Sequence, residues 1–135
     1  ALPRDAVATI KRFLAISGDP DDAVAQLRAL ASDAKLNLAA AIDQFESRVG
    51  FMAARGIDIR TTRFATAFGR GLDYYTGFEF ELHAKGNGSE PLVAGGRYDG
   101  LMSQLGSANP IPAVGFSVWI EAMTRHGKAL RGDVR

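Results

Sequence analysis

The sequence contains no cysteine, and this absence removes several kinds of chemistry at once. Disulfide bridges, thiolate nucleophiles and cysteine-based metal sites are all excluded. Only two histidines are present, His83 and His126, and they do not stand at a metal-binding spacing. We therefore expect neither a metal site nor a cofactor.

An excess of charge of either sign is also absent, since the formal net charge of the 135 residues is +1. No polybasic block is present, so nothing in the composition favours a nucleic-acid partner. No apolar run approaches the length of a membrane span, and the first residues do not resemble a signal peptide. These features predict a soluble, cytoplasmic protein without a membrane partner. The chain starts without methionine and enters a helical pattern at once, so we expect it to be a piece of a longer protein.

Residues 1–56 carry apolar residues at the spacing of amphipathic helices. Pro3 suits the first turn of one helix, and the turn at residues 17–20 can cap a second. Asn37 can cap a third helix, and Gly56 suits the position after its end. We expect the following residues to form buried stripes on the second and third helices: Val24, Leu27, Leu30, Leu38, Ile42, Phe45, Val49 and Met52.

After residue 56 the apolar pattern becomes typical of strands. Residues 57–68 are rich in β-branched and aromatic side chains and predict a strand. Strict alternation over residues 77–84 predicts another, with Glu79, Glu81 and His83 on a solvated face or an interface surface. The Asn87-Gly88 pair predicts a hairpin turn.

The remaining elements complete the expected fold. Residues 92–94 should begin the return strand and residues 95–100 should form a loop. We expect a short helix at 101–105, a strand at 112–118 and a closing helix at 120–129. The order predicts an α+β fold with a mainly antiparallel sheet flanked by helices, and domains at 1–56 and 57–135.

Three segments stand out: residues 70–77 (RGLDYYTG), 94–101 (AGGRYDGL) and 112–122 (PAVGFSVWIEA). The first two combine glycine, arginine and tyrosine in a way that suits an amino-acid pocket. Neighbouring residues of an extended chain point to opposite faces, so either Tyr74 or Tyr75 can line a cavity. Two phenols can orient both nitrogens of an imidazole ring.

Other residues of these segments suit the rest of an amino acid. Arg70, beside glycines, can hold a carboxylate bidentately. Gly95 and Gly96 permit close approach of the backbone to a ligand beside Tyr98. Each feature also has a purely structural interpretation: a turn closed by an Arg70–Asp73 pair, a glycine bulge, or a surface aromatic.

The first two segments resemble the paired histidine-recognition motifs of the histidyl-tRNA synthetase family, and the third resembles motif 3 of class II synthetases. They occur in family order, and the resemblance covers about residues 57–130. It implies part of a class II aminoacyl-tRNA synthetase-like core preceded by a helical insertion.

The resemblance also implies roles for individual residues. Tyr75 and Tyr98 would contact the imidazole of histidine, and Arg70 would contact its carboxylate. The remaining members of the two motifs would line the site (Gly95 and Gly96) or support its loops (Asp73, Tyr74, Arg97 and Asp99).

The third segment departs from the family pattern where synthetases bind ATP. The family ends motif 3 with Gly-x-Glu-Arg, and the first and last of these positions hold Trp119 and Ala122 here. Ala122 offers no charge to a polyphosphate, and Trp119 would fill the space beside the adenine, although it could also be a core aromatic. Loss of one preorganised donor typically costs on the order of 100- to 1,000-fold in rate. We therefore expect a degenerate ATP site and no catalytic residues.

A family member that binds histidine without ATP is expected to be regulatory. The resemblance implies the regulatory subunits of ATP phosphoribosyltransferase, which join a catalytic subunit in the first step of L-histidine biosynthesis and carry feedback inhibition by histidine. A homodimer within a hetero-oligomer is expected. Two alternatives remain: a catalytic-core fragment of a histidyl-tRNA synthetase, and a degenerate module that senses uncharged tRNA.

Overall fold

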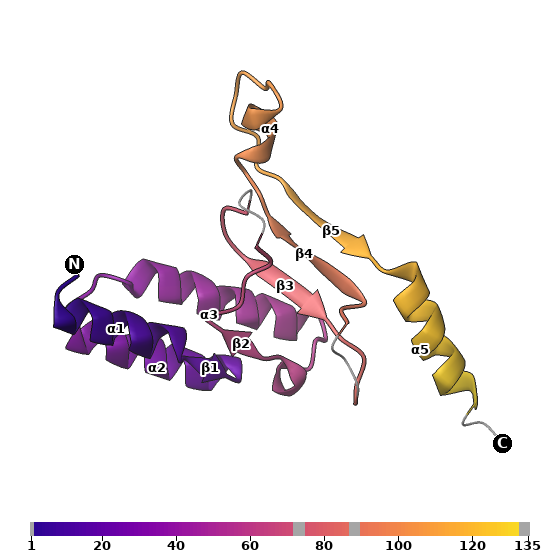
Figure 1. Ribbon diagram of the computed structural model, residues 1–135, viewed down its shortest axis with the longest axis horizontal. Helices are drawn as coiled ribbons and strands as arrows, with labels where there is room; N and C mark the ends of the chain where they lie inside the picture. The colour runs from indigo at the N-terminus through magenta and orange to yellow at the C-terminus, as the bar shows by residue number, and fades with distance from the viewer. Residues whose placement is uncertain (1, 72–74, 87–89, 133–135) are drawn as a thin grey trace. The chain divides into compact units, whose positions relative to one another are not determined.

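The computed structural model describes residues 2–71, 75–86 and 90–132, with side chains in the last helix up to Gly127. The chain forms two compact units, Ala1–Phe68 and Gly69–Arg135, which are described separately (Figure 1). Among the described residues, no helix combines the length and apolar character that a membrane span requires. Helices and antiparallel strands occur together, which confirms the predicted α+β class.

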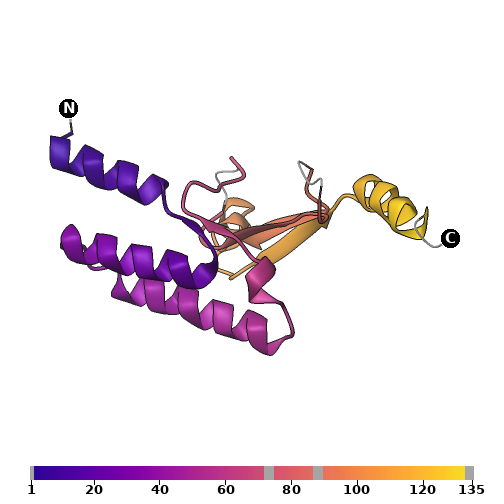
Figure 2. The same cartoon turned by 90° about the horizontal axis from the view of Figure 1, so that it is seen from below.

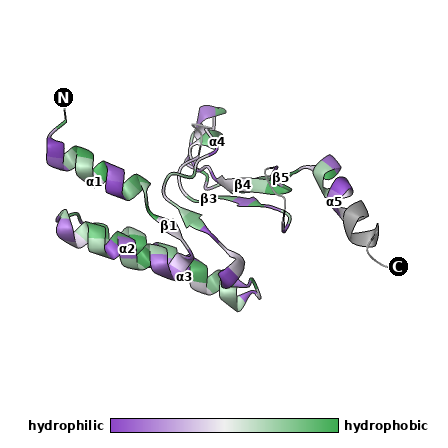
Figure 3. Ribbon diagram, turned by 60° about the horizontal axis from the view of Figure 1, so that its bottom comes forward, coloured by the Kyte–Doolittle hydropathy of each residue, from purple (hydrophilic) through white to green (hydrophobic). Residues whose placement is uncertain are grey.

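The first unit is built on three helices: α1 (Arg4–Leu14), α2 (Pro20–Asp33) and α3 (Ala39–Ala54). Helices α2 and α3 lie side by side (Figure 2). Their facing stripes and Ile16, which precedes β1, form a core. It consists of Ile16, Ala23, Val24, Leu27, Leu30 and Ile42, with Leu38, Phe45 and Phe64 packed against it. Figure 3 shows the alternation of apolar and polar positions along these helices. The stripe predicted for the second helix is confirmed.

The caps of these helices agree with the sequence in part. The carboxylate of Asp19 accepts hydrogen bonds from the backbone N–H groups of Asp21 and Asp22 at the start of α2, as expected for a capping aspartate. The prediction that Asn37 caps α3 was wrong. Leu38 occupies that position, without any side-chain hydrogen bond to the helix. Gly56, just beyond α3, adopts a φ of +85°, which glycine accommodates readily.

The strand predicted over residues 57–68 was wrong in most of its length. Within this range only β2 (Phe64–Ala65) forms a strand, and it pairs antiparallel with β1 (Ser17–Gly18). Before it, the carboxylate of Asp58 accepts the Arg60 N–H and starts a short 3-10 turn, η1 (Ile59–Thr61). A short acidic side chain thus offers the backbone a local alternative to a strand. Because β2 packs with the helices, the first compact unit extends to Phe68 and the second begins at Gly69. The domain boundary at residue 56 stays a prediction.

The second unit holds an antiparallel three-stranded sheet in the order β3 (Glu79–Leu82), β4 (Val93–Arg97) and β5 (Val114–Val118). The helix α4 (Leu101–Gln104) precedes β5, and α5 (Ile120–Gly132) follows it. The antiparallel pairing of the predicted strands is confirmed. The proposed turn residues Asn87 and Gly88 lie outside the described residues.

The prediction of a loop over residues 95–100 was wrong for its first half, because Gly95, Gly96 and Arg97 belong to β4. Glycine usually weakens a strand, unless another part of the chain comes too close for a side chain. At Gly95 a Cβ would overlap the carbonyl oxygen of Gly115 and lie 2.7 Å from Phe116 Cα. Close strand contact therefore explains why glycine is found inside this strand.

The register of the sheet sorts its residues into two faces. Residues paired across neighbouring strands point to the same side, and successive residues point to opposite sides. One side, here called the site face, carries these six residues: Glu79, Glu81, Ala94, Gly96, Gly115 and Ser117. The other side carries apolar residues, among them the exposed side chains of Leu82, Phe116 and Val118.

Candidate functional site

Two tyrosines lie against a pair of glycines on the site face. Gly96 of β4 and Gly115 of β5 are direct cross-strand partners, so side chains at these positions would point the same way. A Cβ on Gly96 would lie 2.8 Å from Cε1 of Tyr75, and a Cβ on Gly115 would overlap the hydroxyl of Tyr98. The two rings have centroids 6.2 Å apart and planes tilted by 56°. The structure therefore brings both phenols to one face of the sheet.

Arg70 is bound to the same face by the glutamates of β3. Its backbone N–H donates to Oε2 of Glu79 at 2.9 Å, and its Nη1 donates to Oε1 of Glu81 at 2.7 Å. The second oxygen of Glu81 lies 3.0 Å from Nε2 of His83. The guanidinium carbon also lies 5.4 Å from the ring centroid of Trp119, within cation–π range. Arg70 is therefore restrained at its backbone, at one nitrogen and at the face of its guanidinium.

The glutamates of β3 were missed as site residues by the sequence interpretation, which placed them on a solvated face or an interface surface. Both are partly buried, and the Glu81 side chain is only 22% exposed. A signal was present in the sequence. A two-residue turn centred on Asn87-Gly88 pairs Glu79 with Gly96, which is the register observed. That pairing puts Glu79 and Glu81 on the face of the Gly96 position.

Asp99 connects the loops around the tyrosines. Its Oδ2 accepts from Nε of Arg97 at 2.7 Å and its Oδ1 accepts from the backbone N–H of Ala113 at 3.0 Å. Its own N–H donates to the hydroxyl of Thr76 at 2.9 Å. The hydrogen bond from Arg97, assisted by that of Ala113, holds the pKa of the Asp99 carboxyl below its ordinary value. The carboxylate and the backbone N–H of Asp99 thus link three segments of the second unit.

Not all predicted site residues come together. Gly95 belongs to the opposite face of the sheet, where it pairs with Phe116. It could therefore contribute to the site only through its backbone. Asp73 and Tyr74 lie outside the described residues. Their expected supporting roles stay predictions.

The third motif contributes to the same unit through its last residues. Trp119 follows β5, and its backbone N–H donates to the carbonyl of Leu92 at 2.9 Å. Its indole is partly buried and lies beside the Arg70 guanidinium. Ala122, on the first turn of α5, is fully buried at 0% exposure. An alanine enclosed in this way offers neither charge nor open space, and loss of the ATP site stays a prediction built on these two residues.

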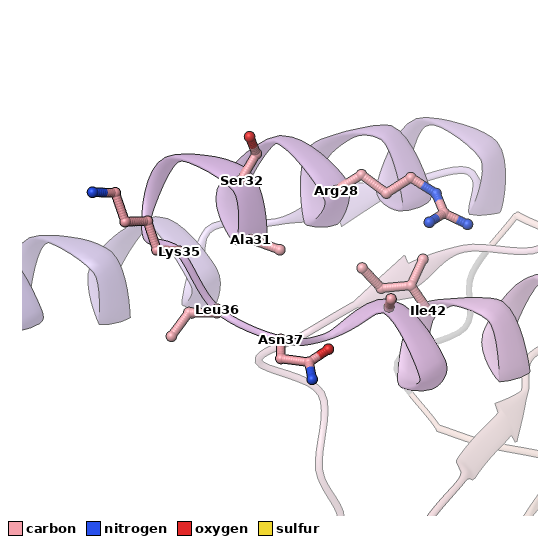
Figure 4. Close-up of a pocket in the computed structure, with 8 residues that line it drawn as sticks. Arg28, Ala31, Ser32, Lys35, Leu36, Asn37 and Ile42 are labelled. Carbon is pink, nitrogen blue, oxygen red and sulfur yellow. The ribbon is translucent and has the colours of Figure 1, made fainter.

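A separate hollow lies in the first unit and contains none of the predicted site residues. It has a volume of about 380 Å³ and lies where α2 ends and α3 begins (Figure 4). The Arg28 guanidinium at its rim is paired with Asp43 and Glu46. Among the described parts of the chain, no cluster of three or more histidine and carboxylate side chains could hold a metal ion.

Comparison with known proteins identifies the family. The model of the histidyl-tRNA synthetase family matches residues 1–123. The chain belongs to this family, and the match includes the helical segment as well as the two tyrosine motifs.

Curated relatives narrow the similarity to one branch. The chain is similar to proteins named ATP phosphoribosyltransferase regulatory subunit. The relative from Mesorhizobium japonicum is 46% identical over 120 residues, which cover 89% of this chain and 32% of the relative. The relative from Agrobacterium fabrum is 43% identical over 132 residues, covering 98% and 34%. The relative from Brucella canis is 39% identical, covering 97% and 34%. The chain spans about a third of the length of these relatives.

Proposed function

We propose that this chain is part of a regulatory subunit of ATP phosphoribosyltransferase that senses L-histidine. The subunit would join a catalytic subunit in the cytoplasm and carry feedback inhibition of the first step of histidine biosynthesis. The names of the relatives support the subunit assignment. The observation that carries histidine binding is the placement of Tyr75 and Tyr98 over the Gly96–Gly115 pair.

The spacing on the site face suits one amino acid with a ring. Arg70 is bound to Glu81, which lies opposite Ala94, whereas Tyr75 lies against Gly96, two residues further along β4. Two residues of a strand span roughly 7 Å. A histidine with its carboxylate at Arg70 would therefore reach the tyrosines with its imidazole. Each phenol can donate to one ring nitrogen or accept from the other.

The residues of the third motif support a non-catalytic role. The family's synthetases use open space and an arginine to hold ATP, whereas this chain has an indole at residue 119 and a buried alanine at residue 122. Histidine binding would then shift the complex toward a less active state instead of leading to an adenylate. Coupling free energies between sites are typically about 1–3 kcal/mol, which is sufficient for feedback control.

The test is a pair of measurements on the full-length protein. Calorimetry without ATP should show histidine binding, and pyrophosphate exchange should show no histidyl-adenylate formation. A transferase complex reconstituted with the protein should then be inhibited by histidine. Robust exchange by the unmodified protein would contradict the regulatory assignment.

A second candidate is the catalytic core of a histidyl-tRNA synthetase, which the name of the matching family favours. The two candidates share the histidine pocket and differ only in the use of ATP. The exchange measurement therefore separates them. A homodimer within the transferase complex is part of the first candidate and would be measured by light scattering on the reconstituted assembly.

A further inference from the structure

The ion pair between Arg70 and Glu81 is shielded from solvent. Their side chains are 17% and 22% exposed, whereas the Arg125 and Glu90 side chains of another ion pair in the same unit are 57% and 49% exposed. Shielded pairs are screened less by salt, and their geometry is held more tightly. Removing charges from water is costly unless the remaining hydrogen-bonding groups find partners. Each buried donor of such a pair therefore needs a hydrogen-bond partner.

One donor of Arg70 is not accounted for. Its Nε is buried, and it has no hydrogen-bond partner among the described residues. An unsatisfied buried donor on a charged group costs more than an ordinary one, so a ligand oxygen at this atom would recover that loss. A carboxylate is the natural match, because it can accept from Nε and a neighbouring nitrogen of the guanidinium at once.

The contacts of Arg70 determine which donors remain for a ligand. Glu81 takes the Nη1 end, and the Trp119 ring lies against the guanidinium at 5.4 Å. The backbone N–H is bound to Glu79, so the start of the side chain is fixed as well. A side chain held in this way has little rotational freedom to lose when a ligand binds.

We propose that Glu81 and Trp119 are positioning residues for Arg70, which fix its guanidinium so that the Nε side meets the carboxylate of a bound amino acid. The inference rests on the proposed function, since it concerns the same pocket. Glu81 and Trp119 would not touch the ligand themselves, but they would set the preference of the site for ligands that carry a carboxylate. Glu81 also keeps a second oxygen bound to His83, which holds the carboxylate in place while Arg70 binds the ligand.

The experiment compares L-histidine with L-histidinol, which keeps the amine and the imidazole and replaces the carboxylate with an alcohol. Calorimetry on the full-length protein gives the ratio of the two dissociation constants. We expect Glu81→Gln to reduce the preference for histidine about tenfold, while histidinol binding stays within about twofold. Trp119→Leu should reduce the preference in the same direction. Glu90→Gln is the matched control, since it removes the acid from an exposed ion pair with arginine, and it should keep the ratio.

The outcomes separate the inference from the proposed function. If the unmodified protein prefers histidine and folded Glu81→Gln keeps that preference, the inference is overturned and the function stands. If Glu81→Gln loses affinity for histidine and histidinol equally, Glu81 has a structural role and the inference is also overturned. If Glu81→Gln does not fold, Glu81→Asp replaces it in the test, because aspartate keeps the charge but withdraws it from Arg70. The same ratio of dissociation constants for histidine and histidinol is then measured. Absence of histidine binding by the unmodified protein would overturn both.

Discussion

Gly96 and Gly115 lie directly opposite each other on neighbouring strands, and the rings of Tyr75 and Tyr98 occupy the space that side chains at these two positions would need. The absence of two Cβ atoms thus makes room for two phenols on one sheet face. The dependence of ring placement on glycine can be tested directly.

Gly115→Ala should displace the Tyr98 ring, because the new methyl group would overlap its hydroxyl. We expect histidine affinity to fall at least about tenfold with a small loss of stability, since the conflict is with the end of one side chain. Calorimetry and thermal unfolding measure the two effects. Gly127→Ala in α5 is the control, because no described atom of another segment lies within 4 Å of the position its methyl group would take, and it should leave binding unchanged. Unchanged histidine affinity in Gly115→Ala would argue against the placement of Tyr98 in the pocket.

Tyr75→Phe and Tyr98→Phe should each weaken histidine binding by about 10- to 100-fold. Each change keeps the ring and removes only the hydroxyl that would pair with an imidazole nitrogen, which leaves that nitrogen without a partner. The two losses should not add, because both hydroxyls bind the same ring. Isothermal calorimetry on the single and double variants measures this, and wild-type affinity in both single variants would exclude the imidazole contacts.

Neither Trp119→Gly nor Ala122→Arg alone should produce pyrophosphate exchange. With arginine at 122 the adenine would still meet the indole, and with glycine at 119 the phosphates would still lack a cation. The structure adds a second expectation, because Ala122 is fully buried. Ala122→Arg should therefore lower the melting temperature, whereas Ala122→Gly should remain inactive in exchange with a smaller stability loss. Exchange activity in either of the first two variants would contradict the account of the degenerate site.

The stabilising contribution of Asp99 should depend on pH. Its pKa in the folded protein is lowered mainly by the hydrogen bond from Arg97, so the contribution is fully present above the ordinary value of 3.8 and is lost as the pH falls through the lower folded pKa. Asp99→Asn should therefore lower the melting temperature by a nearly constant amount between pH 6 and 8, roughly the neutral range, and by less in acid. Thermal unfolding across pH measures the difference. A difference that grows as the pH falls below 3.8 would contradict the sign.

Local patterns predicted much of the second unit. Alternation over residues 77–84 found β3, because a half-buried strand needs apolar side chains on one face only. The same kind of pattern failed over residues 57–68, where composition favoured a strand but the Asp58 carboxylate started a turn. Residue preferences average over many contexts, and a single side-chain hydrogen bond is sufficient to override them.

The sequence motifs predicted the tyrosines of the candidate site but not its ion pairs. Tyr75 and Tyr98 were expected near one ligand, and they do lie on one face. The Asn87-Gly88 turn predicts the register of β3, but the pair between Arg70 and Glu81 also depends on side-chain rotamers, which sequence spacing does not determine. Glu81 therefore looked like one of many glutamates on a solvated strand face.

Asp99 links three segments through hydrogen bonds with Arg97, Thr76 and Ala113, while the tyrosine rings lie against Gly96 and Gly115. Different residues thus supply the proposed contacts to a ligand ring and the hydrogen bonds that link the loops. We expect substitution at Tyr75 or Tyr98 to alter ligand preference while leaving the hydrogen bonds of Asp99 in place. A framework of this kind lends itself to acquiring new amino-acid preferences in few mutational steps, and it offers a starting point for biosensors directed at other ring-bearing metabolites.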